Sequence, residues 1–321
     1  MPRFGYFLSC EEFGPAELVR QAKLAEQAGF DRLWISDHYH PWNSEQGQSP
    51  FVWSVIGALS EATSLPITTA VTCPTVRIHP AVIAQAAATA AVQCTGGFTL
   101  GVGTGEALNE HIFGDAWPPA QARLAMLAEA IEVIRLLHTG QQTSYDGEFY
   151  QVENARIYTL PDGAQPVPIY VSGFGPKSAE LAGGIGDGFI SVQPDRDLVD
   201  AFRSGGGDGK PAQAGMKLCY AESEADGVRT AHRLWANEQL PGELAQVLPT
   251  PRHFEQASEL VSPEMVAAAV PCGNDAERFV KAIDEYTAAG YDEIYLQQIG
   301  PEQDRFFDFW AETLAAEVGA N

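Results

Sequence analysis

The sequence predicts a (β/α)8 barrel. Short apolar, β-branched runs alternate with longer segments of helical period along the chain. Eight such units fit within the 321 residues, and their spacing stays even to the C-terminus. Parallel strands need helical crossovers, and eight of them close a sheet into a barrel. A doubly wound open sheet is the alternative, and the even spacing favours the barrel.

The expected elements follow from this alternation. The predicted strands are residues 4–9, 32–36, 67–71, 98–102, 169–172, 188–191, 216–220 and 293–297. The predicted helices are residues 15–27, 51–63, 80–93, 119–137, 176–182, 194–203, 225–237, 274–289 and 303–317. Several of these helical segments open with proline, which suits the first helical turn.

Two stretches depart from the repeat. Residues 143–152 carry an Asp146-Gly147 turn between aromatic residues, which is typical of a small hairpin. Residues 238–269 form an insertion ahead of the last strand. No linker-like composition divides the chain, so we expect residues 1–321 to form a single barrel domain with these two insertions.

The composition limits the expected partners. The chain has 42 Asp and Glu residues against 19 Lys and Arg, a net charge of −23. Such a charge repels nucleic acid and anionic membranes, so neither is expected as a partner. It fits either self-repulsion that keeps the protein dissolved or adaptation to a high-salt cytoplasm. The sequence has neither an apolar run long enough to cross a bilayer nor an N-terminal leader, which predicts a cytoplasmic protein.

The five cysteines are an odd number and are widely spread, without a C-x-x-C pair. This pattern supports neither a disulfide framework nor a zinc ribbon. We therefore expect free thiols in a reducing compartment.

Two strings at strand ends carry the candidate chemistry. Ser36-Asp37-His38-Tyr39-His40-Pro41-Trp42 follows the second strand, and Gly101-Val102-Gly103-Thr104-Gly105-Glu106 follows the fourth. The loops after the strands share one face of a barrel, so His38, Trp42 and Glu106 can meet there, together with Glu11 after the first strand. One imidazole, one indole and two carboxylates make a plausible proton-handling site. Packing roles for His38 and Trp42 are the alternative.

A second candidate site is the turn Ser172-Gly173-Phe174-Gly175-Pro176-Lys177. It follows a strand, is rich in glycine and begins a helix, whose first N–H groups point outward. Lys177 adds one of only five lysines in the chain. A phosphate of a cofactor would suit this turn, and an ordinary β-α turn is the alternative. The spacing of Gly101, Gly103 and Gly105 lacks the third glycine of a dinucleotide-binding fingerprint.

A metal site is not expected. His38-x-His40 is the spacing of a metal-binding pair after a barrel strand. Further ligands would have to follow later strands, and no histidine follows the fifth, sixth or eighth predicted strand. A Gly-x-Ser-x-Gly nucleophile elbow is also absent from the sequence.

Four motifs together resemble a known family. They are Ser36-Asp37-His38-x-x-Pro41-Trp42, residues 74–85 (Pro-Thr-x-Arg-x-x-Pro-Ala-Val-Ile-Ala-Gln), residues 101–110 (Gly-Val-Gly-Thr-Gly-Glu-Ala-Leu-Asn-Glu) and residues 186–190 (Gly-Asp-Gly-Phe-Ile). Over most of its length the chain resembles the luciferase-like (bacterial luciferase-type) barrel superfamily. Within it, the chain is most similar to the dehydrogenases that use the deazaflavin coenzyme F420, including the glucose-6-phosphate and secondary-alcohol branches.

The resemblance implies a hydride-transfer enzyme that uses F420. His38 would take the proton of a substrate hydroxyl, and Trp42 would stabilise the charged intermediate. Glu106 would handle the proton near the deazaflavin ring nitrogen, and Glu11 would support the substrate side. The residues implied to contact the cofactor are Asp37, Ala70, Val71, Cys73, Gly105, Asn109, Ser172, Gly173, Phe174, Gly175, Pro176 and Lys177. Ala70-Val71 is the implied place of a cis peptide bond behind the ring.

The resemblance leaves the substrate open. The sugar-phosphate branch gathers cations around the phosphate, whereas the comparable positions here are Asp195, Gln256 and Ala269. We therefore expect a neutral alcohol or unphosphorylated sugar as the small-molecule substrate. The alternatives are a sugar-6-phosphate dehydrogenase, a carbonyl or imine reductase running in reverse, an FMN-dependent monooxygenase and a flavin-binding helper protein. The resemblance also implies a homodimer.

Overall fold

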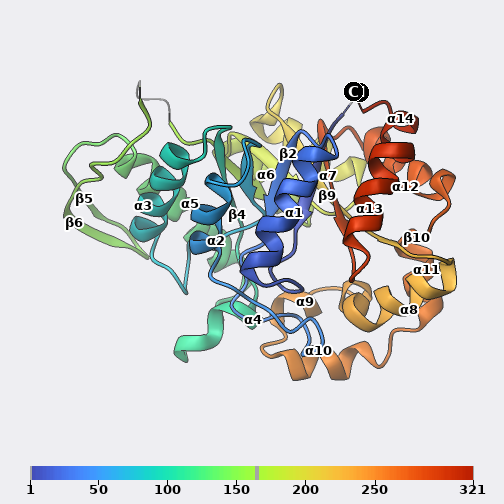
Figure 1. The fold of residues 1–321 in the computed structure, drawn as a ribbon. Coiled ribbons are helices and arrows are strands. Elements are labelled where there is room, and N and C mark those ends of the chain that lie inside the picture. Colours follow the sequence, from blue (N-terminus) through green and yellow to red (C-terminus); the bar gives the residue numbers. More distant parts are fainter. Residues whose placement is uncertain (1, 163–165, 321) are drawn as a thin grey trace.

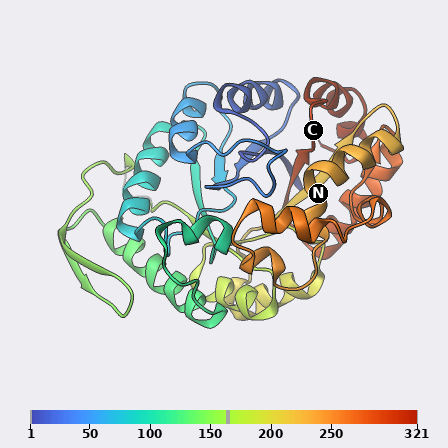
Figure 2. The ribbon, with the colours of Figure 1, turned by 90° about the horizontal axis from the view of Figure 1, so that it is seen from below.

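Eight parallel strands close into a barrel in the computed structural model, which describes residues 2–162 and 166–320 (Figures 1 and 2). Neighbouring strands pair in the order β11-β1-β2-β3-β4-β7-β8-β9, and β9 pairs with β11 to close the ring. The barrel strands are β1 (Arg3–Leu8), β2 (Arg32–Ile35), β3 (Ile67–Thr69), β4 (Phe98–Val102), β7 (Ile169–Ser172), β8 (Gly188–Ser191), β9 (Ala212–Tyr220) and β11 (Glu293–Gln298). The predicted (β/α)8 fold is confirmed.

A ring of helices surrounds the barrel, which Figure 2 shows nearly along its axis. The helices are α1 (Pro15–Gln27), α2 (Val52–Ser60), α3 (Pro80–Gln93), α4 (Ala107–Glu110), α5 (Ala120–Leu137), α6 (Pro176–Ile185), α7 (Arg196–Phe202), α8 (Glu224–Trp235), α9 (Leu244–Val247), α10 (Pro251–Ser258), α11 (Pro263–Ala269), α12 (Ala276–Ala289), α13 (Gln303–Phe309) and α14 (Ala315–Glu317).

Helix boundaries follow local capping chemistry. In α3, Pro80 occupies the first turn and the imidazole of His79 accepts a hydrogen bond from an N–H of that turn. In α12, the Asp275 carboxylate caps the start, and Gly290 ends the helix with φ of 98°. These helices begin and end within two residues of the predicted bounds.

Several elements differ from the sequence prediction. Strand β9 begins at Ala212, earlier than predicted, because it pairs on both sides, with β8 and with β11. The predicted helix 303–317 is divided by a π-helical turn (Trp310–Leu314) between α13 and α14. The short helix α4 and the two-residue strand β10 (Cys272–Gly273) were not predicted, because elements this short leave no periodic pattern.

Both predicted insertions have structures of their own. The first is an antiparallel hairpin of β5 (Thr143–Asp146) and β6 (Gln151–Ala155), which projects from the barrel at the left of Figure 1. The second folds into α9, α10 and α11; in Figure 1, α9 and α10 lie beside α4 at one end of the barrel, and α11 lies beside α8. Phe254 of α10 is fully buried and meets the ring of Trp42 edge-on, with centroids 5.0 Å apart.

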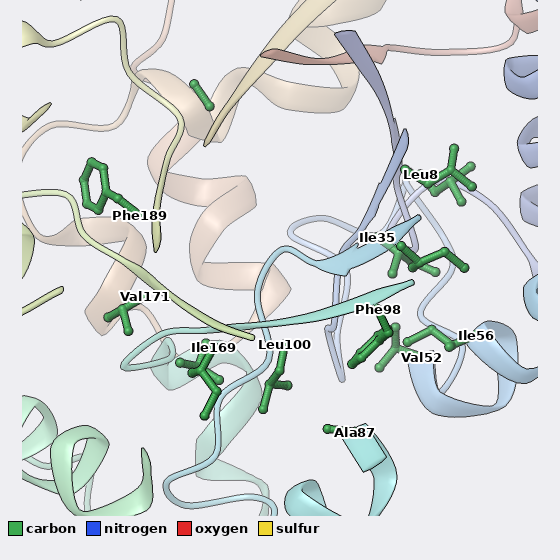
Figure 3. Packing of buried hydrophobic residues seen from close by; sticks show 14 of the residues in the cluster. Leu8, Ile35, Val52, Ile56, Ala87, Phe98, Leu100, Ile169, Val171 and Phe189 are labelled. Atoms are coloured by element: carbon green, nitrogen blue, oxygen red, sulfur yellow. The ribbon is translucent and has the colours of Figure 1, made fainter. Parts of the chain in front are cut away.

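The main core lies between the strands and the surrounding helices (Figure 3). Leu100, the register partner of Ile169 on the neighbouring strand, lies near Ala87, one of the small residues that α3 buries. Fully burying a side chain such as Leu100 contributes about 1.5–3 kcal/mol. A separate cluster of Phe7, Trp34, Ile190 and Tyr295 lies apart from this core, with Trp34 stacked on Tyr295 at 4.3 Å.

The five cysteines are buried free thiols. Of the helices within residues 2–162 and 166–320, none is both long enough and apolar enough to cross a membrane.

Candidate active site

Two adjoining hollows open where the barrel strands end. The inner cavity has a volume of about 280 Å³, and Phe7, Trp34 and Ile190 line it. The outer groove, of about 560 Å³, runs along the glycine-rich loops after β4 and β7. The two hollows share Val71, Glu106, Ser172, Phe174, Gly242 and Gln246 as lining residues. A ligand can therefore extend from one hollow into the other.

His38 lines the inner cavity and contacts polar groups on both sides of its ring. Its Nδ1 lies 3.1 Å from the carbonyl oxygen of His40, an acceptor, and 3.2 Å from Nδ2 of Asn109, a donor. Its Nε2 lies 3.4 Å from Oε1 of Glu11. A proton taken up by His38 is therefore held beside a carboxylate.

Glu11 is held as a carboxylate in this pair. Its Oε2 accepts hydrogen bonds from the hydroxyls of Ser9 (2.8 Å) and Ser36 (2.7 Å). Burial disfavours the charged form of Glu11 and so raises its pKa. The nearby His38 and the two hydroxyls have a larger, opposite effect and hold the pKa of Glu11 below its usual value. Sequence reasoning gave Glu11 a supporting role, and the structure places it directly against the imidazole.

Trp42 lies beside His38 on the cavity wall. The two ring centroids are 5.0 Å apart, and the indole is 9% exposed. The backbone N–H of Trp42 donates to Gln46, which donates in turn to the carbonyl of Leu234 at the end of α8. This anchoring holds the His38 loop against the segment that follows β9.

Asn109 connects the two predicted strings but does not line either hollow. Its Oδ1 accepts hydrogen bonds from the backbone N–H groups of Tyr39 (2.9 Å) and His40 (3.2 Å). Its Nδ2 donates to Oε2 of Glu106 at 3.2 Å. The amide therefore fixes the His38 loop relative to Glu106, which lines both hollows.

Asp37 also faces away from the hollows. Its carboxylate accepts hydrogen bonds from Thr72 and from the guanidinium of Arg77, each at 2.8 Å. Arg77 also bonds Glu110, whose pKa burial raises to about 7, although Arg77 opposes the rise. This buried network supports the loops from behind, and Asp37 lines neither hollow.

The segment after β3 lies between the hollows. The Ala70–Val71 peptide bond is cis, as the resemblance implied. Ala70 lines the inner cavity and Val71 lines both hollows. Cys73 lines neither hollow; its thiol lies 2.9 Å from the Thr75 hydroxyl, and burial raises its pKa well above the usual value.

The outer groove combines glycine-rich backbone with cationic side chains. Gly105 has φ of 77°, and Gly173 has no room for a side chain, because a Cβ there would lie 2.9 Å from the backbone nitrogen of Ala179. The groove wall also includes Lys177 at the start of α6 and Arg123 of α5. The predicted turn residues that line the groove are Ser172, Gly173, Phe174, Gly175, Pro176 and Lys177. Two cations and a helix N-terminus suit a phosphate.

Sequence reasoning missed one wall of the inner cavity. Lys217 of β9 lines it and forms an ion pair with Glu238, 3.1 Å between Nζ and Oε1. The ammonium also lies 4.4 Å from the ring centroid of Trp235. Asn237 lines the same wall. The only sequence signal was the long insertion that begins at residue 238, since long loops on a barrel often carry function.

Comparisons with known proteins agree with this geometry. A family model described as "Luciferase-like monooxygenase" matches residues 1–293. The chain is 35% identical to the F420-dependent glucose-6-phosphate dehydrogenase of Nakamurella multipartita, over 99% of this chain and 97% of that one. It is 34% identical to the enzyme of the same name from Mycobacterium tuberculosis, with 98% of each chain covered.

Solved structures show the same fold. An F420-dependent secondary alcohol dehydrogenase, in complex with an F420-acetone adduct, superimposes with a TM-score of 0.91 at 30% identity and covers 98% of each chain. The F420-dependent tetrahydromethanopterin reductase of Methanopyrus kandleri superimposes with a TM-score of 0.80 at 20% identity over 99% of each chain, which supports the fold.

The fold and the site define a (β/α)8-barrel protein with an acid–base pair at the end of the strands, beside a glycine-lined groove. The chain belongs to the luciferase-like monooxygenase family. The resemblance drawn from the four sequence motifs is confirmed.

Proposed function

We propose that this protein is an F420-dependent oxidoreductase that acts on a neutral alcohol or unphosphorylated sugar. The observation that carries the proposal is the pairing of His38 with Glu11 on the wall of the inner cavity, with 3.4 Å between Nε2 and Oε1. In the oxidation, His38 would take the proton of the substrate hydroxyl while the carbinol becomes a carbonyl. F420, when bound, supplies the hydride acceptor.

Each site residue has a part in this proposal. His38 takes the hydroxyl proton, and Glu11 stabilises the imidazolium that results. Trp42 packs beside the imidazole, with Phe254 edge-on against its own ring, and excludes water from that side. Glu106, on the boundary of the two hollows, handles the proton on the cofactor side.

The groove residues support F420 as the cofactor. An apolar wall at Ala70 and Val71 suits a flat ring, and the turn that ends at Lys177 suits the cofactor phosphate. The relatives named above are F420-dependent enzymes. Asp37, Cys73 and Asn109 act as supports behind this wall in the proposal.

The charge of the site supports a neutral substrate. Asp195 caps α7 and Gln256 is exposed on α10, so neither supplies a cation to the cavity. Lys217 is a cation on the wall, which the sequence argument overlooked, but Glu238 neutralises it. The curated relatives are named for glucose 6-phosphate and the structural neighbour for a secondary alcohol, so a sugar-6-phosphate dehydrogenase stays the main alternative.

The test is anaerobic turnover with F420. We expect bleaching of F420 by simple alcohols or free sugars, without oxygen consumption in air. Strong preference for glucose 6-phosphate over both would contradict the neutral substrate. Oxygen uptake with FMN, and no reaction with F420, would instead identify a monooxygenase. Faster reduction of a ketone or imine by reduced F420 would show that the enzyme runs as a reductase, with His38 as the proton donor.

We also propose that the protein is a homodimer. Phe51, Val82 and Val92 expose apolar side chains at or beside α2 and α3, and Trp53 lines a hollow between these helices. Exposed apolar patches of this kind often lie in interfaces. Light scattering after size-exclusion chromatography should give twice the chain mass, and the mass of one chain would contradict the proposal.

A further inference from the structure

One buried amide in the inner cavity has no structural partner. Gln297, near the end of β11, is 1% exposed and lines the cavity. Within residues 2–162 and 166–320, neither its Oε1 nor its Nε2 has a hydrogen-bond partner. A buried polar group left unpaired costs about 1–3 kcal/mol. Packing alone therefore does not explain an amide at this position.

The next residue on the strand gives the contrast. Gln298 is equally buried, but its Oε1 accepts from the N–H of Tyr220 at 2.8 Å. Its Nε2 donates to the carbonyl oxygens of Tyr220 and Ile299. Gln298 thus joins β11 to β9, whereas its neighbour points its amide into the cavity without such a role.

Other polar groups lie on the same wall. Lys217 is the register partner of Gln297 on β9, and its ammonium is paired with Glu238. The Oδ1 of Asn237, a residue only 4% exposed, also lacks a partner among the described residues. Gln297, Lys217, Glu238 and Asn237 all line the inner cavity. Among the described residues that line it, Lys217 is the only lysine or arginine.

These groups match hydroxyls better than any other ligand chemistry. An amide both donates and accepts hydrogen bonds, as a hydroxyl does. The Lys217–Glu238 pair adds donors and acceptors without net charge. A phosphate dianion would meet the Glu238 carboxylate, and a simple secondary alcohol would leave the amide of Gln297 unpaired.

We propose that Gln297, Asn237 and the Lys217–Glu238 pair form a subsite for the spectator hydroxyls of a polyhydroxylated, unphosphorylated substrate. The substrate class is a free sugar or sugar alcohol, whose reacting hydroxyl meets His38. This inference rests on the proposed function and narrows its substrate. Gln297 is the residue that distinguishes such a substrate from a simple alcohol.

The first test compares the Gln297→Leu variant with the wild-type protein, using glucose and 2-propanol as substrates. Leucine fills a similar volume, so we expect unchanged or higher thermal stability once the unpaired amide is gone. The kcat/KM for glucose should fall about ten-fold, mainly through KM, while that for 2-propanol changes less than about two-fold. Equal losses for both probes, or none for glucose, would overturn the subsite.

Gln298→Leu is the matched control. It removes the same chemical group from the adjacent position, where the amide holds two strands together. It should lower the melting temperature and leave the ratio of glucose to 2-propanol kcat/KM unchanged. A change in that ratio as large as in Gln297→Leu would show that the effect is not specific to the cavity, and would overturn the proposal.

The charge pair gives an independent test. Glu238→Gln leaves Lys217 without its counter-charge, so we expect the kcat/KM for glucose 6-phosphate to rise about ten-fold relative to glucose. A wild-type protein that already prefers glucose 6-phosphate, or a variant in which the ratio stays unchanged, would contradict a neutralised subsite.

Calorimetric measurement of glucose binding distinguishes a failure of the subsite from a failure of the proposed oxidoreductase function. Glucose binding that Gln297→Leu weakens about ten-fold supports the subsite even if the wild type never reduces F420, in which case only the proposed function fails. An absence of glucose binding overturns the subsite even if 2-propanol is turned over, in which case the proposed function stands.

Discussion

At the scale of single residues, the chemistry depends on the pairing of His38 with Glu11 on the cavity wall. On the other side of the ring, Nδ1 of His38 lies against the carbonyl of His40 and the side-chain amide of Asn109. Asn109 fixes the loop that supplies this carbonyl. The base is therefore oriented by the backbone, and its charge is balanced by Glu11.

This orientation predicts strong coupling between two substitutions. His38→Asn should lower kcat by about 10²–10⁴-fold, because general base catalysis contributes that much. Glu11→Gln alone should lower kcat about ten- to hundred-fold, since the imidazolium loses its partner. In the His38→Asn background, the same Glu11→Gln change should have almost no further effect. Steady-state kinetics of the four proteins measures this.

The F420 dissociation constant should stay within about two-fold in all four proteins, because His38 and Glu11 line only the inner cavity. His253→Asn, at an exposed site on α10, is the control and should keep full activity. Additive losses in the double variant would mean that the two residues act separately, contrary to the geometry.

At the scale of elements, the sequence predicts well where local chemistry fixes the boundary. Helix α1 has the predicted bounds, with Pro15 in its first turn. The early start of β9 was missed, because Ala212 and Gly215 lack the β-branched pattern and join the strand through pairing with β8 and β11.

The same limit applies to the site. His38, Trp42 and Glu106 stand out because they follow strands in short, regular loops. Trp235 ends α8 and Glu238 lies in the turn just after it, and their position on the cavity wall depends on tertiary packing. The indole of Trp235 donates to Glu12, whose pKa burial raises to about 7, and a contact across 223 positions leaves no local sequence signal.

The start of α6 carries a prediction at this scale. Lys177 lines the outer groove beside the N–H groups of the first helical turn. Lys177→Gln should raise the Kd for F420 about five- to ten-fold, because an ammonium–phosphate contact is lost. It should also weaken the dependence of this Kd on salt. Fluorescence titration at two ionic strengths measures both effects.

Lys281→Gln is the control for this substitution, since Lys281 is an exposed residue of α12 and lines neither hollow. It changes the net charge of the protein by the same amount. If both variants weaken F420 binding equally, the effect comes from overall charge, and the turn is not the phosphate site.

At the scale of the whole molecule, the buried network of Asp37, Arg77 and Glu110 ties stability to pH. Burial raises the pKa of Glu110 from 4.5 to about 7, against the opposing effect of Arg77. A raised pKa means that the folded protein binds the proton more tightly than the unfolded chain. The stabilisation is complete below about pH 4.5 and is lost as the pH rises through about 7.

Glu110→Gln removes this titration. The free energy of unfolding of the wild type, relative to the variant, should therefore fall by about 3 kcal/mol at most between pH 4.5 and pH 8. Urea unfolding across this pH range measures the difference. A difference that stays constant, or that grows with pH, would show that Glu110 is ionised throughout and that Arg77 dominates its surroundings.

The central claim is that the outer groove, together with the wall at Ala70 and Val71, holds F420. The most direct measurement is a fluorescence titration of the purified protein with F420 and, separately, with FMN, in low and in high salt. The structure and its relatives predict tight binding of F420 and weak binding of FMN. Tight binding of FMN alone would contradict the claim and would place the protein among the oxygen-using members of its family.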